Sequence, residues 1–291
     1  MVTAILIGSA HTPLDQGRVD GLRAAWNGGE TTWLAPGEAA EFHLEEVPGD
    51  VDAAGEAARR DGFDLAVIAG DNRRKRLLLA DMDSTMIGQE CIDELAAAAG
   101  IGEKVAEITA RAMNGELDFE GALIERVSLL KGVDQGLIGT VLNERITLAR
   151  GGKALVATMR AHGAYTALVS GGFVQFTRAV AQAIGFDEHR ANRLLEGAGT
   201  LSGEVARPIL GRAAKVDALR QLVRDRELDA DDVLAVGDGA NDLGMIGAAG
   251  LGVALHAKPN VAAAAPVRID HADLTALLYL QGYRRDEFVR G

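Results

Sequence analysis

Two aspartates, Asp81 and Asp83, stand one residue apart directly after the apolar run 77–80. The run predicts a buried parallel strand, so both carboxylates are expected where the chain turns out of a sheet. Carboxylates in such a place can hold a hard cation and attack a phosphorus atom. Calcium loops and turn caps also use this pair, so its companions further along the chain decide between the interpretations.

Three later features supply those companions. Ser170 and Gly171 follow a second apolar run and offer a hydroxyl and unobstructed backbone N–H groups at an expected helix start, which suits a phosphate oxygen. Lys215 begins a helical stretch, and the segment 237–242 (Gly-Asp-Gly-Ala-Asn-Asp) follows a third apolar run. Carboxylates, a hydroxyl turn and a lysine in this order favour a site that handles phosphate.

This order of motifs resembles the haloacid-dehalogenase-like phosphotransferases and, in more detail, the phosphoserine phosphatase family. The resemblance covers roughly residues 74–285 and is weak or absent over the first seventy. The residues that carry it are Asp81 to Thr85, Glu90, Asp118 to Glu120, Arg126 to Leu130, Ser170 to Gly172, and Gly237 to Asp242.

The resemblance implies a covalent mechanism with Asp81 as the nucleophile that forms an aspartyl phosphate. Asp83 is then the acid that protonates the leaving serine oxygen and the base that activates water. The implied cofactor is Mg²⁺, with Asp81, Asp238 and the main-chain carbonyl of Asp83 as its protein ligands. Asp242, one helical turn after Asp238, is expected to support the site by fixing Lys215 or a metal-bound water.

The same resemblance assigns the phosphate group to Ser170, Gly171, Lys215 and Asn241. A single lysine in a helical stretch is usually a solvated residue, and a Ser-Gly-Gly turn is common at strand ends. Lys215 stands 23 residues before Asp238, a spacing that fits the family and favours the functional interpretation.

Substrate choice is expected to depend on residues between the first two core strands. O-phosphoserine carries an ammonium and a carboxylate beyond its phosphate, so its recognition needs one acid and one guanidinium. Glu90 and Arg126 match the family positions for these roles, and Met113 and Phe119 match apolar residues that close over the substrate. By spacing alone, the first two are better explained as helix-surface charges and the other two as core contacts. The joint match of Phe119, Arg126 and residues 127–130 to the family favours the functional interpretation.

The strands that position these residues are expected at 77–83, 165–170 and 232–238, with long helical stretches between them. This alternation predicts an α/β fold with a doubly wound parallel sheet, which binds ligands at the carboxyl ends of its strands. Helical periodicity between the first two strands predicts a cap over about 88–150, within a catalytic domain of 74–291. Its helices are expected at 90–99, 102–114, 118–130 and 134–149, and two short strands at 191–210.

Residues 1–72 are predicted to form a separate small α/β domain, joined to the next strand by a solvated basic linker. The order of its elements is loosely compatible with a degenerate amino-acid-sensing module, which longer relatives carry at this position. A role in forming a homodimer is equally compatible with it. Its strands are expected at 2–7, 41–47 and 64–69, and its helices at 17–27 and 51–60.

Composition excludes several function classes. A net charge of −12 over 291 residues argues against nucleic-acid partners, which need basic surfaces. No basic residue precedes the apolar N-terminus, and no segment approaches the ~20 apolar residues of a membrane span. The single cysteine, Cys91, is typical of a reducing compartment, and we interpret it as a buried helix residue. These features predict a cytoplasmic protein without a membrane partner.

The leading hypothesis is therefore a Mg²⁺-dependent phosphoserine phosphatase that releases serine and inorganic phosphate in the last step of serine biosynthesis. A first alternative is a related phosphatase for another small phosphomonoester, although a sugar phosphate offers no zwitterion for Glu90 and Arg126. A second alternative is a ligand-sensing protein whose N-terminal unit is the functional part. The intact set of catalytic residues argues against that alternative.

Overall fold

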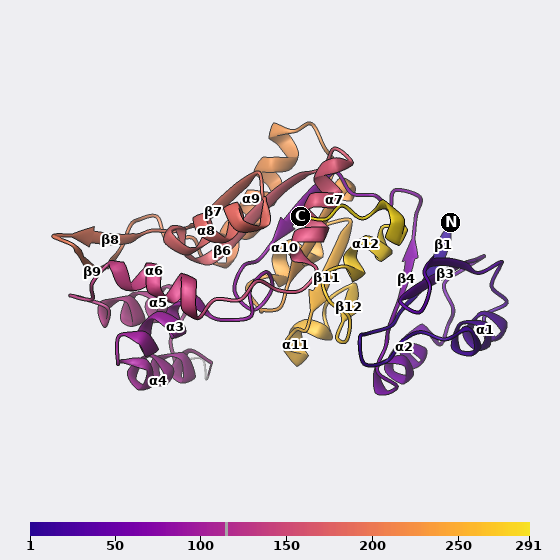
Figure 1. Ribbon diagram of the computed structural model, residues 1–291, viewed down its shortest axis with the longest axis horizontal. Helices are drawn as coiled ribbons and strands as arrows, with labels where there is room; N and C mark the ends of the chain where they lie inside the picture. The colour runs from indigo at the N-terminus through magenta and orange to yellow at the C-terminus, as the bar shows by residue number, and fades with distance from the viewer. Residues whose placement is uncertain (114–115) are drawn as a thin grey trace.

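The computed structural model describes residues 1–113 and 116–291, without the side chain of Met113. Its centre is a six-stranded parallel sheet with the strand order β12-β11-β10-β5-β6-β7 (Figure 1). The strands are β5 (Leu77–Ala80), β6 (Tyr165–Phe173), β7 (Glu188–Asn192), β10 (Val233–Gly237), β11 (Leu251–Leu255) and β12 (Val267–Ile269).

The order of these strands creates a switch point beside β5. The chain runs from β5 outward through β6 and β7, then returns to the other side of β5 and continues through β10, β11 and β12. Ala80 pairs with Val236 of β10 on one side and with Leu168 of β6 on the other. Residues that follow these positions emerge together at the carboxyl edge, where open α/β sheets bind ligands.

Helices cover both faces of this sheet because alternate residues of β5 point to opposite sides. Leu78 and Ala80 pack with residues of α7, α8 and α12, whereas Leu77 and Leu79 pack with residues of α9 and α10. None of the helices within the described residues is long and apolar enough to cross a membrane. The core helices are α7 (Gly152–Ala161), α8 (Val174–Ile184), α9 (Arg212–Asp225), α10 (Leu243–Ala248), α11 (Pro259–Ala262) and α12 (Ala276–Leu280), with 3₁₀ turns at Ala230–Asp232 and Arg285–Glu287.

A helical cap is inserted between β5 and β6. The two segments that join it to the core lie side by side, because Gly88 N donates to Thr147 O (3.0 Å) and Ala149 N donates to Met86 O (2.9 Å). The segment that follows residue 144 returns to the core, so the last cap helix ends at 144 rather than at the expected 149. The cap helices are α3 (Cys91–Ala98), α4 (Gly102–Met113), α5 (Phe119–Ser128) and α6 (Gly136–Glu144).

The hairpin of β8 (Leu194–Gly197) and β9 (Thr200–Val205) leaves the core and pairs with the cap. Gly132 N donates to Leu201 O (2.9 Å), and Leu201 N donates to Val133 O (2.8 Å). The predicted doubly wound core, the helical insertion after its first strand and the additional N-terminal unit are confirmed.

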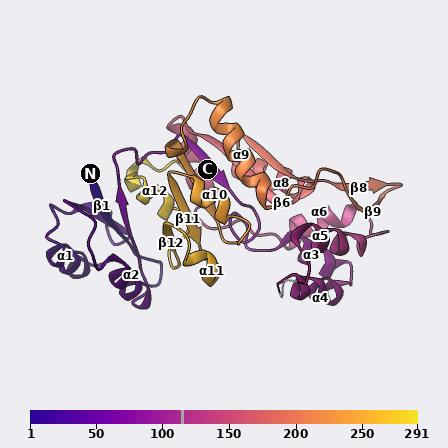
Figure 2. The same cartoon turned by 180° about the vertical axis from the view of Figure 1, so that it is seen from behind.

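The N-terminal unit forms an antiparallel sheet with the order β2-β3-β1-β4, the split β-α-β arrangement. The sequence interpretation missed the short strand β2, which pairs with β3 and shifts the start of β3 from the expected 41 to 39. Figures 1 and 2 show this unit and the cap at opposite ends of the molecule. The elements are β1 (Val2–Ile7), α1 (Gln16–Ala25), β2 (Thr32–Ala35), β3 (Ala39–Leu44), α2 (Val51–Arg60) and β4 (Asp64–Ala69).

The N-terminal unit is held to the core by apolar and polar contacts. One face of its sheet packs on its own helices, and the other contributes Ile5 and Ile7 to the same cluster as α12. The buried carboxylate of Asp64 accepts backbone N–H groups from the loop after β12, namely those of residues 270 (2.8 Å), 271 (3.1 Å) and 272 (2.9 Å). The unit is therefore docked on the side of the sheet away from the cap.

Candidate active site

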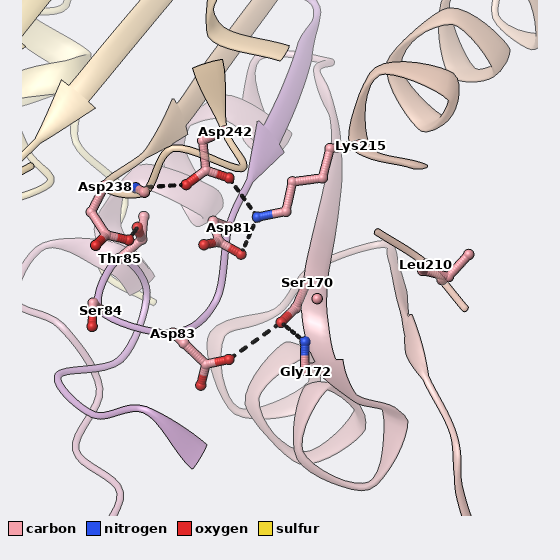
Figure 3. A network of polar contacts seen from close by, with 12 residues as sticks. Asp81, Asp83, Ser84, Thr85, Ser170, Gly172, Leu210, Lys215, Asp238 and Asp242 are labelled. Carbon is pink, nitrogen blue, oxygen red and sulfur yellow. Dashed lines mark hydrogen bonds and ion pairs between the residues drawn. The ribbon is translucent and has the colours of Figure 1, made fainter. Parts of the chain in front are cut away.

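Several of the predicted site residues meet at the carboxyl edge of the sheet, namely Asp81, Asp83, Ser170, Lys215, Asp238 and Asp242 (Figure 3). Asp81 leaves β5 with its backbone N–H donated to Val236 O (3.0 Å), which extends the β5–β10 ladder by one bond. Asp238 follows directly after β10. Because neighbouring parallel strands end at the same level, the two carboxylates lie on either side of the switch point.

A buried ion-pair network occupies the centre of the site. Lys215 Nζ, on the first turn of α9, lies 2.6 Å from Asp81 Oδ1 and 2.5 Å from Asp242 Oδ1. Asp242 Oδ2 accepts the backbone N–H of Gly239 (2.9 Å). A Cβ at Gly237 would lie 2.4 Å from Asp242 Cγ, so glycine is required there for this close approach. Asp242 thus fixes the lysine relative to the strand end.

The charges in this network have shifted pKa values. Burial raises the pKa of Asp81, and the adjacent Lys215 opposes that shift only in part. Burial alone would lower the pKa of Lys215, but the carboxylates of Asp81 and Asp242 outweigh it and raise that pKa. Lys215 is therefore a fixed cation at neutral pH.

Three buried carboxylates, two of which pair with Lys215, lie close together. One oxygen each of Asp81, Asp238 and Asp242 lies within 4.8 Å of the other two. Thr85 Oγ1 donates to Asp238 Oδ1 (3.3 Å), and burial, followed by the charges of Asp242 and Glu90, raises the pKa of Asp238 to about 6. Hard oxygen donors with excess negative charge suit a divalent cation such as Mg²⁺. The side chain of Asp83 is not part of this group.

Asp83 lies between the core and the cap. Its Oδ1 accepts the backbone N–H of Cys91 (3.0 Å), the first residue of cap helix α3, and its Oδ2 accepts the hydroxyl of Ser170 (3.4 Å). Burial, together with the charge of Glu90, raises its pKa to about 6. A carboxyl group with a pKa near neutrality is suited to both proton donation and proton acceptance.

The turn at Ser170 and Gly171, which the sequence predicts to bind phosphate, differs from its prediction in one respect. Helix α8 begins at Val174, so Ser170 and Gly171 lie on an irregular extension of β6 rather than at the helix start. Gly172 N donates to Ser170 Oγ (2.8 Å), and a Cβ at Gly172 would lie 2.9 Å from Asp83 Oδ2. The extension arises because β7 continues to pair with β6, through Asn192 and Phe173, beyond the irregularity.

A cavity of about 560 Å³ lies over these groups and is lined by both core and cap. Glu90, Phe119 and Arg126 line it from the cap, and Ser84 Oγ donates to Glu90 Oε1 (2.8 Å). Asn241 lines it from the core, beside Asp81 and Asp83. Met113 ends α4, but its side chain lies outside the described residues.

Arg126 lines this cavity without an ion-pair partner among the described residues. Its Nε donates to the carbonyl oxygen of Ala122 (3.3 Å), and no described carboxylate lies at ion-pair distance from it. Burial lowers its pKa, although Asp93 and Glu90 oppose that shift. A half-buried guanidinium without a partner is available to an anionic ligand.

Sequence reasoning missed other residues at this cavity. Arg212, Lys258 and Asn260 line it, and Lys258 N donates to Asp238 O (3.2 Å). Lys258 belongs to the loop that follows the apolar strand β11. The position of that loop next to a strand end was the one signal that pointed to the site. Asn192, which is buried behind the turn at Ser170 and Gly171, carried no such signal.

Comparison with known proteins agrees with this geometry. Residues 78–246 match the family model of haloacid dehalogenase-like hydrolases. The phosphoserine phosphatase of Streptomyces coelicolor is 43% identical over 228 residues, which are 78% of this chain and 55% of that protein. The phosphoserine phosphatase of Lactococcus lactis is 43% identical over 204 residues, which are 70% of this chain and 94% of that protein.

One solved structure extends the similarity beyond the catalytic core. A probable phosphoserine phosphatase from Vibrio cholerae superposes with a TM-score of 0.80 and 33% sequence identity. The superposition covers 98% of this chain and 88% of that one. The similarity in fold therefore reaches the first seventy residues, where the sequence alone gives little resemblance.

Proposed function

The chain belongs to the phosphoserine phosphatase family of the haloacid dehalogenase-like hydrolases, and on that premise we propose that it hydrolyses O-phosphoserine to serine and inorganic phosphate. The observation that carries this proposal is one cavity with two kinds of group. Asp81, which is paired with the buried Lys215, lies at its floor, and Glu90 and the guanidinium of Arg126 line it from the cap. These groups complement a phosphate at one end and a zwitterion at the other.

The reaction proceeds in two displacements. Lys215 holds Asp81 Oδ1, so Oδ2 attacks phosphorus. The bond from phosphorus to the serine oxygen breaks while Asp83 gives that oxygen a proton. Water then attacks the aspartyl phosphate, Asp83 accepts its proton, and phosphate and the Asp81 carboxylate are released. The pKa of about 6 at Asp83 suits both transfers.

Mg²⁺ is the proposed cofactor, because the cluster of buried carboxylates is a hard-oxygen donor set. Asp81, Asp238 and the main-chain carbonyl of Asp83 would hold the ion, which supplies positive charge toward the phosphoryl oxygens. Asp242 serves this arrangement indirectly, since it fixes Lys215 and the Gly239 N–H.

The remaining predicted residues bind the substrate. Ser170, Gly171, Lys215 and Asn241 hold the phosphate. The ammonium binds Glu90, whose orientation is set by the Ser84 hydroxyl, and the carboxylate binds Arg126. Phe119 and Met113 close over the substrate from the cap.

Phosphate release from a panel of phosphomonoesters, with Mg²⁺ and with a chelator, tests this function. We expect the highest kcat/KM for phosphoserine, loss of activity with chelator and recovery when Mg²⁺ is restored. The panel includes phosphoethanolamine, which lacks the carboxylate, and an aryl phosphate, which lacks both amino-acid groups. Equal kcat/KM across the panel would keep the chemistry at Asp81 but refute the substrate assignment.

A place in serine biosynthesis follows from the same reaction, since free serine is its product. Expression of the chain should restore growth without serine to a bacterial strain that lacks its own phosphoserine phosphatase. The Asp81→Asn variant, expressed to the same level, is the control that should not restore growth. Equal growth with that variant would contradict the assignment.

The proposed domain boundary near residue 72 has its own test. Residues 1–72 contain a hydrophobic cluster between their sheet and helices α1 and α2, and residues 70–72 are exposed. Limited proteolysis of the full chain should therefore cut first near Gly70 and give two fragments that remain associated. A first cut inside 74–291 would place the boundary elsewhere.

A further inference from the structure

A buried asparagine behind the phosphate-binding turn joins two segments that are distant in sequence. Asn192 ends β7 and is 2% exposed. Its Nδ2 donates to Gly171 O (2.8 Å) and Leu210 O (3.2 Å), and its Oδ1 accepts the Leu210 N–H (2.7 Å). A buried amide with all these bonds satisfied fixes the groups it contacts. Asn192 therefore sets the distance between the turn at Gly171 and the segment that precedes α9, where Figure 3 shows Leu210.

Each of these segments presents a glycine to the same aromatic ring. A Cβ at Gly171 would lie 3.1 Å from Phe119 Cζ, and a Cβ at Gly211 would lie 3.4 Å from Phe119 Cδ1. Phe119 is the first residue of cap helix α5, whereas both glycines belong to the core. The ring of the cap thus contacts the core through two glycines, which we call the glycine notch.

The backbone does not require glycine at either position of the notch. Gly211 has φ −96° and ψ −159°, which is extended backbone that any residue adopts, and Gly171 continues strand β6. At Gly171 an added Cβ would be tighter against the ring than ordinary contact. At Gly211 a single Cβ fits, but a β-branched side chain extends further toward the ring. The space filled by Phe119 is therefore the physical reason for small residues here.

We propose that Asn192 is a positioning residue that holds the glycine notch together and so seats Phe119 when the cap closes over the substrate. The inference rests on the proposed function, since it assigns Asn192 and Gly211 to the closed, substrate-covering state of that site. Because Gly171 follows Ser170 in the phosphate-binding turn, the same three bonds link cap closure to the position of that turn.

Double-mutant cycles with Phe119 test the proposal. Gly211→Val fills one wall of the notch, and Asn192→Asp keeps the side-chain shape but sets an oxygen against the carbonyls of Gly171 and Leu210. Each should lower kcat/KM by about tenfold in the parent, as expected for a misplaced cap residue. In the Phe119→Ala background the same substitutions should lower kcat/KM by a several-fold smaller factor, because no aromatic ring has to be positioned there. Gly139→Val, at a cap position where a Cβ meets nothing within 4 Å, is the matched control.

Amide hydrogen exchange of α5 gives a readout besides activity. With inorganic phosphate as the probe, exchange over residues 119–128 should be faster in Gly211→Val and Asn192→Asp than in the parent and in the Gly139→Val control. The proposal would be overturned if each substitution lowered kcat/KM by the same factor in the Phe119→Ala background as in the parent. Hydrogen exchange over α5 equal to that of the parent would also overturn it. The cycles are measured with phosphoserine and with an aryl phosphate. Failure of the substrate assignment then shows as a lost preference for phosphoserine, independently of the coupling to Phe119.

Discussion

Replacement of Arg126 by alanine should separate substrate recognition from chemistry. Arg126 is half-buried at the cap side of the cavity and has no ion-pair partner among the described carboxylates. Burial lowers its pKa, and the carboxylates of Asp93 and Glu90 oppose that shift. Because Arg126 forms no ion pair with a described carboxylate, its removal should change the melting temperature little.

The loss of kcat/KM for phosphoserine can be estimated from the hydrogen bond that Arg126 would donate to the substrate carboxylate. A hydrogen bond to a charged group contributes about 1.5–3 kcal/mol, which corresponds to about a 10- to 150-fold loss in kcat/KM. An aryl phosphate lacks the carboxylate, so its hydrolysis should change less than threefold, roughly the scatter of such measurements. Phosphoethanolamine, which keeps the ammonium but not the carboxylate, should behave like the aryl phosphate.

The assay compares kcat/KM for the three substrates in the parent, in Arg126→Ala and in Arg111→Ala. Arg111 lies on cap helix α4, is partly exposed and pairs with Glu116 and Glu125, so its removal reports on charge loss in the cap alone. Equal losses on all three substrates in Arg126→Ala would refute a role in carboxylate recognition. That result would mean that Arg126 acts on the phosphate or on the packing of the cap.

Three other changes probe the floor and the mouth of the cavity. Asp81→Asn should abolish phosphate release while far-UV circular dichroism stays unchanged, because the amide cannot attack phosphorus; more than trace turnover would contradict the covalent mechanism. Lys215→Met removes the cation between buried carboxylates and should lower the free energy of unfolding by about 3–5 kcal/mol, part of which Mg²⁺ should restore. Denaturant unfolding with and without Mg²⁺ measures this change. An unchanged free energy of unfolding would show that Lys215 does not stabilise the network. Arg212→Ala and Lys258→Ala remove cations from the cavity mouth of an acidic chain. In each variant kcat/KM should depend less steeply on ionic strength than in the parent or in the remote control Arg220→Ala. Identical salt dependence in all four proteins would exclude electrostatic steering of the substrate by these cations.

The sheet and the position of the site could be predicted because both depend on local patterns. Strands buried on two faces appear in the sequence as continuous apolar runs, as 77–80 does, and parallel strands place their carboxyl ends together. Any polar residue directly after such a run, such as Asp81 or Asp238, is therefore expected at one edge. The cap could be predicted for the same reason, because each of its helices shows helical periodicity of apolar residues in the sequence.

Other parts of the site depend on contacts that no local pattern records. Gly211 looks like an ordinary residue before a helix, and Asn192 like an ordinary polar residue at the end of a strand. Their proposed roles rest on tertiary contacts, since Phe119 lies against Gly211 and Asn192 is hydrogen-bonded to Leu210. Strand β2 was missed because its four residues are too few to show alternation.

The contacts of Asp83 link the proposed proton donor to the cap. One carboxylate oxygen is held by a backbone N–H at the start of cap helix α3, and the other by the core hydroxyl of Ser170. Glu90, which precedes that helix, also contributes to the pKa of about 6. If the cap opens, Asp83 loses one of its hydrogen bonds and the neighbouring charge together. Under the proposed mechanism, the proton donor is therefore fully positioned only when the cap covers the substrate. The closed cap also excludes bulk water while the serine leaving group departs.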